Sequence, residues 1–315
     1  MKYSEKTLKR FVNDFSLPIQ VPTNEMIPYY IELYDPVYST KQKWNIFKSI
    51  VSKFSTEEEF VDYCYKLTDE VINTIKSTEA YEYFKNCDID AILPIHNELF
   101  EIPYKKSINL YKQTNDGKYF ISIDLRKANY QALRFFDSDI VLGSDTYEDM
   151  IERFTNEEYF KQSKSIRQII FGNLDTKRIP HCERFLTEKV LDWVNKTNYP
   201  KDKIIEFTTD ELILECQPQV FLGTRGCNII QEEIYKYSGV EVKVEDFRLK
   251  YIGNDTYVKE HSDNLPPTFK GGSSVYFPQA YKAYMGLPLE DKDLCFLYEK
   301  HLAKFEEPLT WIIGG

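Results

Sequence analysis

The sequence predicts an α+β fold in which a small sheet is backed by helices. Residues 1 to about 115 have mainly helical patterns, and β-rich runs come later, at 118–124, 203–215 and 239–252. Helical patterns separate these runs along the chain. A strand followed by a helix, then a helical insertion and a hairpin, suits one sheet with helices packed on it.

The composition is that of a globular protein that can bury a sizeable core. Of the 315 residues, 42% are hydrophobic and 29% are charged. The net charge of −10 gives no global attraction to nucleic acid or anionic lipid, although a local basic groove is compatible with it. Six scattered cysteines without a CxxC pattern indicate free thiols in a reducing compartment. With no signal-peptide core and no apolar run of about 18 residues, we expect a soluble, cytoplasmic protein without membrane contact.

The N-terminal elements are predicted from hydrophobic periodicity and from capping residues. Thr56 and the three glutamates that follow it make a good helix start. Pro18, Pro22, Pro28 and Pro36 are expected to break the early chain into irregular connections. Helices are predicted at 4–15, 41–54, 56–75 and 78–86.

The later elements are predicted in the same way. A turn signal at 114–117 precedes the first strand, 118–124. Beyond residue 255, Pro266-Pro267 and Gly271-Gly272 predict turns, and short helical pieces follow. The remaining predicted elements are a helix at 126–136, helices at 145–160, 162–174 and 180–197, the hairpin 203–215, a helix at 225–237 and a β-rich run at 239–252.

Acidic residues stand at the ends of two of the predicted strands. Asp124 closes the first strand, and Asp210 and Glu211 occupy the tight turn of the hairpin. Burying such carboxylates unpaired is costly, so the hairpin pair either sits exposed at the tip or holds a cation. Taken alone, Asp124 is better explained as the cap of the helix that begins at Arg126. Two strands that bring carboxylates to one edge of a sheet favour a Mg²⁺ site beside a phosphate.

These residues resemble a known family. Asp124, the helix 162–174 and the turn Thr209-Asp210-Glu211-Leu212 resemble, in this order, the three polymerase motifs of the family A DNA polymerases. In that family the fingers helix has the form Arg-x-x-Lys-x-x-x-Phe-Gly. Here Lys164, Arg167 and Phe171-Gly172 keep the spacing, with the two basic residues exchanged in type. The similarity covers roughly 118–252.

The resemblance implies a compact polymerase-type palm sheet with a helical fingers insertion and a helical N-terminal region, and no exonuclease. Residues 1–115 would form a helical, thumb-like region. Residues 116–254 would form the palm, with fingers helices inserted at about 137–200. Residues 255–315 would be a C-terminal extension without a counterpart.

The resemblance also implies a site and an activity. Asp124 and Asp210 would hold two Mg²⁺ ions, with Mn²⁺ as the alternative, and Glu211 would be a secondary ligand or a hydrogen-bonding neighbour. The expected activity is template-directed nucleotidyl transfer, with a primed nucleic-acid template and nucleoside triphosphates as partners. In the fingers helix, Lys164 and Arg167 share a face with Phe171; the two cations would contact the triphosphate and Phe171 the base.

Departures from the family pattern leave alternatives open. Thr209 replaces the family's histidine, and Asp175-Thr176 replace a Tyr-Gly pair. Asn129 stands where motif A has a glutamate, and the resemblance implies that Asn129 contacts the nucleotide there. Sugar preference is therefore not set by the sequence. One alternative is a catalytically silent, polymerase-derived binding or assembly protein, and another is one subunit of a split polymerase that needs a partner subunit. A third is an unrelated α+β module, in which Asp124 and Asp210 would lie far apart.

Overall fold

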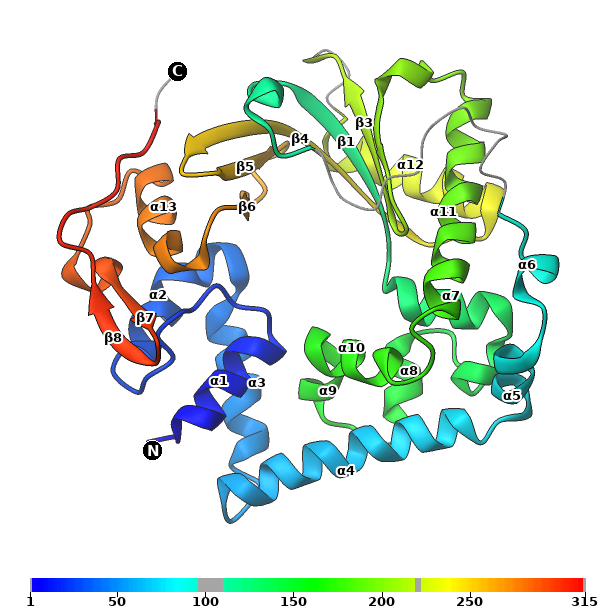
Figure 1. Ribbon diagram of the computed structural model, residues 1–315, viewed down its shortest axis with the longest axis horizontal. Coiled ribbons are helices and arrows are strands. Elements are labelled where there is room, and N and C mark those ends of the chain that lie inside the picture. Colours follow the sequence, from blue (N-terminus) through cyan, green and yellow to red (C-terminus); the bar gives the residue numbers. More distant parts are fainter. Residues whose placement is uncertain (1, 96–109, 219–221, 314–315) are drawn as a thin grey trace.

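The computed structural model describes residues 2–95, 110–218 and 222–313, and it confirms the α+β class (Figure 1). A six-stranded sheet has the order β2-β3-β1-β4-β5-β6, and every neighbouring pair is antiparallel. Its strands are β1 (Tyr119–Leu125), β2 (Ile204–Phe207), β3 (Glu211–Cys216), β4 (Val242–Gly253), β5 (Thr256–His261) and β6 (Thr268–Gly271).

The N-terminal region is helical, as predicted. The four predicted helices are confirmed as α1, α3, α4 and α5, and Thr56 caps α4 by accepting from the amide of Glu59. Helix α2 was not predicted, since its prolines were taken as helix breakers. Pro28 lies in its first turn, where no amide donor is needed, and Pro36 lies only in its last turn. The helices are α1 (Glu5–Asp14), α2 (Ile27–Tyr38), α3 (Thr40–Val51), α4 (Glu57–Lys76), α5 (Glu79–Asn86) and α6 (Ile89–Ile92).

The central helices follow β1 and precede the hairpin. The helix predicted at 145–160 is wrong as a single element, because the chain leaves the helix after α8 and starts again at α9. Between the two, the buried Thr155 accepts from the amide of Glu157 and holds the chain in a local turn. The helices are α7 (Ala128–Phe136), α8 (Tyr147–Glu152), α9 (Glu158–Gln162), α10 (Lys164–Gly172), α11 (Arg178–Lys196) and α12 (Gly223–Ser238).

The sheet continues into the segment beyond residue 255, where turns and short helices were predicted. Asn254 and Asp255 both have a positive φ, of 49° and 54°, and Gly253 pairs with Thr256 across them. Two such residues between paired strands form the tight turn that matches the twist of a hairpin. The Asn-Asp pair was therefore a usable signal for β5. After β6 come α13 (Phe277–Tyr284) and the hairpin of β7 (Cys295–Tyr298) and β8 (His301–Lys304).

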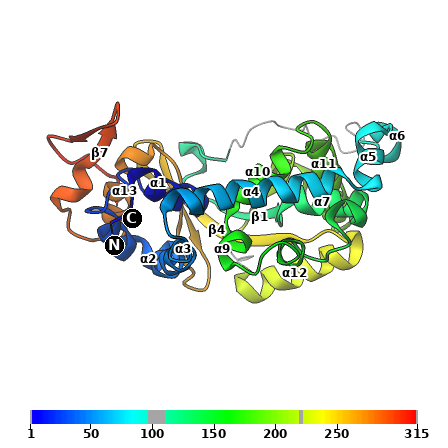
Figure 2. The same cartoon turned by 90° about the horizontal axis from the view of Figure 1, so that it is seen from below.

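The two faces of the sheet carry different side chains, because successive residues of a strand point to opposite sides. Ile121, Ile123 and Leu125 of β1 join the main core, to which α11 and α12 also contribute, and α12 lies on one side of the strands (Figure 2). Phe120 lies on the other face, in a second, smaller cluster. Asp124, four residues from Phe120, shares this second face.

The chain ends pack together beside the sheet. Tyr34 of α2 packs edge-on against Phe277 and Tyr281 of α13, and Lys282 lies 2.9 Å from the buried carboxylate of Asp293. Tyr29 donates a hydrogen bond to the same carboxylate.

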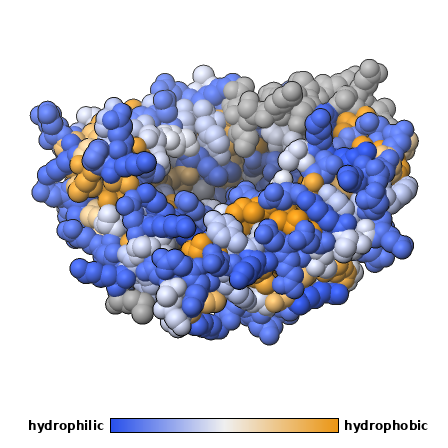
Figure 3. Space-filling model, turned by 60° about the horizontal axis from the view of Figure 1, so that its bottom comes forward, coloured by the Kyte–Doolittle hydropathy of each residue, from blue (hydrophilic) through white to orange (hydrophobic). Residues whose placement is uncertain are grey.

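Helix α4 runs along the side of the molecule opposite the sheet and leads to α5 (Figure 1). The face of the molecule shown in Figure 3 is largely hydrophilic, with apolar side chains in scattered groups. Within the described ranges, no helix is long and apolar enough to cross a membrane.

Helix α1 is joined to α9 and α10 by a buried polar network. The Asp14 carboxylate lies 3.0 Å from the Arg10 guanidinium and accepts a hydrogen bond from the Tyr159 hydroxyl. Ser163, which caps α10, donates to the Asp14 carbonyl at 3.2 Å. Asp14, Tyr159 and Ser163 are all buried. The N-terminal helix thus fixes the start of the predicted fingers helix.

We predict that Asp14→Ala lowers the free energy of unfolding by about 3 kcal/mol, because it leaves the Arg10 guanidinium buried without its carboxylate partner. Denaturation in urea measures this loss. Glu5→Ala is the matched control on the same helix: it removes an exposed ion pair with Lys9, and no measurable change is expected. Equal urea concentrations at the midpoint of unfolding for the two variants would contradict the prediction.

Candidate functional site

The register of β1 brings the predicted acids together at one end of the sheet. Asp124 pairs with Glu211 on β3 and with Lys243 on β4. The amide of Leu125 donates to the Asp210 carbonyl at 2.8 Å, so the hairpin turn lies directly against the end of β1. The wide separation of Asp124 and Asp210 expected for an unrelated module is not observed.

Asp124 carries an unfavourable charge in this arrangement. Burial raises the pKa of Asp124 to about 7, and the negative charges of Glu211 and Asp210 add to the effect. Lys243 and Lys259 oppose the rise but do not cancel it. A cation at this end of the sheet would relieve the repulsion among the three carboxylates.

Glu211 is engaged by its neighbours on the sheet. It accepts a hydrogen bond from the Ser122 hydroxyl at 2.5 Å and lies 3.9 Å from the ammonium group of Lys259. Lys259 is itself buried and sits 4.4 Å from the centre of the Phe247 ring. This geometry agrees with the role of a hydrogen-bonding neighbour for Glu211 and leaves Asp210, which is exposed at the turn, as the accessible hairpin carboxylate.

A pocket of about 620 Å³ opens beside Asp124. It lies between the end of β1, the start of β4 and the helices α7, α8 and α10. Basic side chains predominate among its charged groups, and two tyrosines form part of its wall. The lining residues are Asp124, Leu125, Arg126, Lys127, Tyr130, Gln131, Arg134, Asp145, Thr146, Tyr147, Arg167, Glu241 and Lys243.

The basic side chains of the pocket differ in how far they are already paired. Lys127 forms an ion pair with Glu148, and Arg134 lies 2.8 Å from Asp145. The Arg167 guanidinium lies 5.6 Å from the centre of the Tyr147 ring, and its buried Nε has no hydrogen-bond partner among the described residues. Burial lowers the pKa of Arg167. Arg167 is thus a desolvated cation with hydrogen-bonding capacity left for an anion.

The backbone at the start of α7 adds to the positive character of the pocket. Lys127, at the N-cap position, has a φ of 48°, in the left-handed region that non-glycine residues rarely occupy, and its side chain does not cap the helix. Gly239, by contrast, ends α12 in the same region with no side-chain strain. Residues 125–127 at the start of α7 border the pocket, and no side chain of the described residues caps this helix end, so its amide groups add positive potential near the pocket.

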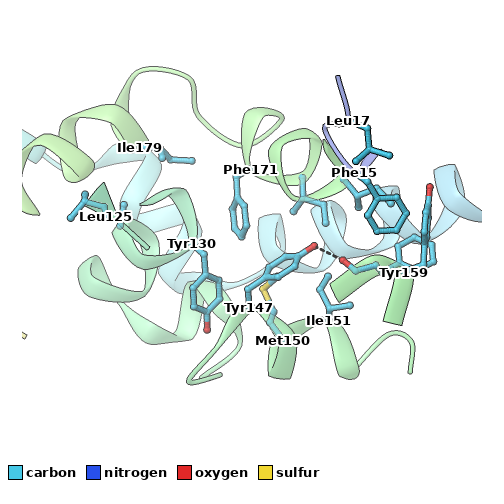
Figure 4. Packing of buried hydrophobic residues seen from close by; sticks show 14 of the residues in the cluster. Phe15, Leu17, Leu125, Tyr130, Tyr147, Met150, Ile151, Tyr159, Phe171 and Ile179 are labelled. Atoms are coloured by element: carbon cyan, nitrogen blue, oxygen red, sulfur yellow. Dashed lines mark hydrogen bonds between the residues drawn. The ribbon is translucent and has the colours of Figure 1, made fainter. Parts of the chain in front are cut away.

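Three predicted contact residues lie elsewhere. Lys164 is exposed in the first turn of α10 and does not line the pocket. Phe171 was predicted to face a base; it is only 1% exposed, because α10 packs on α4 and on α1, and it lies against Tyr130 and Tyr147 in the core (Figure 4). Asn129 is half-buried on α7 and does not line the pocket.

Most residues of the pocket wall were not among those predicted from the sequence. Tyr130 and Arg134 are one helical turn apart on α7, so their i, i+4 spacing was a usable signal. Tyr147 and Lys243 come from distant elements and had no local signal. Tyr147 is fully buried and donates to the Phe160 carbonyl at 3.2 Å (Figure 4). Lys243 enters the site only through its register opposite Asp124.

In residues 2–95, 110–218 and 222–313, no three His, Cys, Asp or Glu side chains are already arranged to bind one metal ion. Comparison of the sequence with models of known protein families found no match, and neither did comparison with curated proteins. The function is therefore argued from the site.

We predict that Asp124→Asn stabilises the protein at high pH. An aspartate whose pKa is raised from about 3.9 to about 7 destabilises the fold when it is ionised, so the variant should be more stable by about 3 kcal/mol at pH 8. The difference should shrink as the pH falls from 7 toward 4 and vanish about one pH unit below 4, where Asp124 is protonated in both the folded and the unfolded chain. Urea denaturation in EDTA at pH 8, 6 and 4 measures it. A variant less stable than the wild type at pH 8 would contradict the prediction.

Proposed function

We propose that the protein is a template-directed nucleotidyltransferase, similar to a DNA polymerase, that depends on two Mg²⁺ ions. The observation that carries the proposal is the position of Asp124. It stands between the hairpin acids and a pocket lined by five basic side chains, so one residue borders both a cation site and an anion site. Phosphoryl transfer depends on such an arrangement, because positioning and charge neutralisation supply most of its catalysis.

The residues present fit a divalent cation. Asp124 and Asp210 are hard oxygen ligands on adjacent elements, and Mg²⁺ in proteins commonly uses one or two carboxylates together with water and substrate phosphates. The raised pKa of Asp124 reflects repulsion that such an ion would offset. When bound, the ions would activate a 3′-hydroxyl and stabilise the charge of the leaving pyrophosphate.

The chain's own residues would place the nucleotide. Arg167 would contact the triphosphate through its free hydrogen-bonding capacity, supported by the start of α7 and by Lys243 at the β4 edge. Tyr130 and Tyr147, both buried, would keep the wall of the pocket rigid. Asp124 would hold the cation that neutralises the reacting end of the triphosphate next to the hairpin.

In this proposal, residues 116–254 form the palm, with fingers helices inserted at about 137–200 and the helical residues 1–115 as a thumb-like region. The strands β5 and β6 widen the palm sheet, and the rest of 255–315 packs on the N-terminal helices. The partners would be a primed nucleic-acid template and nucleoside triphosphates.

A second function is favoured by one specific observation. Acidic side chains already neutralise three of the pocket's cations, through the pairs Lys127–Glu148, Arg134–Asp145 and Lys243–Glu245, and Glu241 also lines the pocket. A pocket whose own acids neutralise most of its cations gains less from binding an anionic substrate. This favours the catalytically silent binding or assembly protein, or one subunit of a split polymerase.

Primer extension tests the proposal directly. On a primed DNA template with Mg²⁺ or Mn²⁺, the wild-type chain should extend the primer, and Asp210→Asn should abolish extension because a cation ligand is lost. Parallel reactions with deoxyribonucleotides and ribonucleotides would reveal the sugar preference. If no combination of template, metal and nucleotide gives extension, the chain alone is not a polymerase; recovery on adding a partner subunit would identify the split enzyme.

We further predict that Arg167→Ala raises KM for the nucleoside triphosphate about tenfold to a hundredfold, because a charge-assisted contact to phosphate is lost. Arg167→Lys should recover only part of the affinity, since an ammonium cannot make the forked contact. Lys164→Ala is the matched control on the same helix, and KM should change by about twofold or less because Lys164 lies outside the pocket. A larger effect from Lys164 than from Arg167 would refute this placement of the triphosphate.

A further inference from the structure

Glu183 on α11 is a buried carboxylate without a partner. The residue is only 8% exposed, and its side chain forms no hydrogen bond or ion pair with any described residue. Glu188, on the same helix, is buried to a similar degree but lies 3.6 Å from the Arg184 guanidinium. Burying an unpaired carboxylate costs free energy. The Arg184 guanidinium offsets part of this cost for Glu188, whereas no described residue offsets it for Glu183.

The fold places Glu183 next to the hairpin turn. Thr187, one helical turn further along α11, donates to the Thr209 carbonyl at 2.7 Å. Side chains four residues apart lie on the same face of a helix and lean toward its N-terminus, so Glu183 projects along the same side of α11 as Thr187. Thr209 is followed by Asp210, so this side of α11 faces the hairpin turn. Burial raises the pKa of Glu183 to about 7, and the negative charge of Asp210 adds to the rise.

We propose that Glu183 and Asp210 together bind a divalent cation, Mg²⁺ or Mn²⁺, on the α11 side of the hairpin turn. Two carboxylates are sufficient for Mg²⁺, which usually retains several water ligands. Asp210 is exposed at the turn, and its carboxylate accepts one long hydrogen bond, 3.4 Å, from the Thr208 hydroxyl, which it can exchange for a cation at little cost. Glu211, by contrast, is engaged by Ser122 and Lys259. The proposal shares Asp210 with the proposed function and rests on it to that extent, but it concerns cation binding alone.

A Mn²⁺ titration of the full chain at pH 8, followed by the electron paramagnetic resonance signal of free Mn²⁺ without nucleotide or nucleic acid, tests the proposal. Glu183→Gln should weaken Mn²⁺ binding about tenfold or more, because a charged ligand is lost while the shape of the side chain is kept. Glu188→Gln is the matched control and should bind Mn²⁺ as the wild type does. Asp210→Asn should reproduce the effect of Glu183→Gln.

A second measurement guards against a folding artefact. Mg²⁺ should raise the melting temperature of the wild type, since a ligand that binds only the folded chain stabilises it, and this rise should be reduced in Glu183→Gln. Unchanged Mn²⁺ binding and an unchanged Mg²⁺ response in Glu183→Gln would overturn the inference, and so would a wild type that binds no Mn²⁺.

The inference and the proposed function can fail separately. A chain that never extends a primer but loses Mn²⁺ binding in Glu183→Gln would retain this cation site and lose the polymerase assignment. An active polymerase whose Mn²⁺ binding is unaffected by Glu183→Gln would retain its function without the Glu183 site.

Discussion

The pairing of β1 on both sides is the constraint on which the candidate site depends. Because β1 lies between β3 and β4, its register decides which residues of two other strands meet Asp124. A shift of one residue would turn every side chain of β1 to the opposite face and bury Asp124 among the apolar residues of the main core. The apolar Ile121, Ile123 and Leu125 prevent that shift, since they have to face the helices. The packing of the core thus fixes the register of β1, and this register brings the residues of the site together.

Charge is distributed unevenly around this end of the sheet. Carboxylates gather at the hairpin turn, and basic side chains gather across Asp124 in the pocket. Neither group is balanced within itself, although Glu148 and Asp145 neutralise part of the basic side. Such a separation of charge is unfavourable for folding alone, and sites of this kind are commonly functional. This separation of charge is the structural feature that connects the resemblance to polymerases with the proposed chemistry.

The position of the predicted fingers helix depends on the opposite end of the chain. Helix α10 is capped by Ser163, whose hydroxyl also bonds to the Asp14 carbonyl, and α4 packs along it. Arg10, Asp14 and Tyr159 form a buried ion pair and hydrogen bond at this contact. Arg167 therefore meets the pocket from a helix held by residues about 150 positions earlier. The N-terminal helices, which carry none of the predicted site residues, support the site in this way.

The sequence by itself determined the fold class, most of the helices, the strand that carries Asp124 and the hairpin that carries Asp210 and Glu211, because periodicity, capping and turn residues act over a few neighbouring positions. It did not reveal α2, whose prolines sit at tolerated positions, or the strand β5. Only the tertiary structure decided that Phe171 belongs to the core, that Tyr147 and Lys243 line the pocket, and that Glu183 stands unpaired near Asp210. Those roles follow from strand register and helix packing between residues far apart in the chain, and no local pattern of side chains records such contacts.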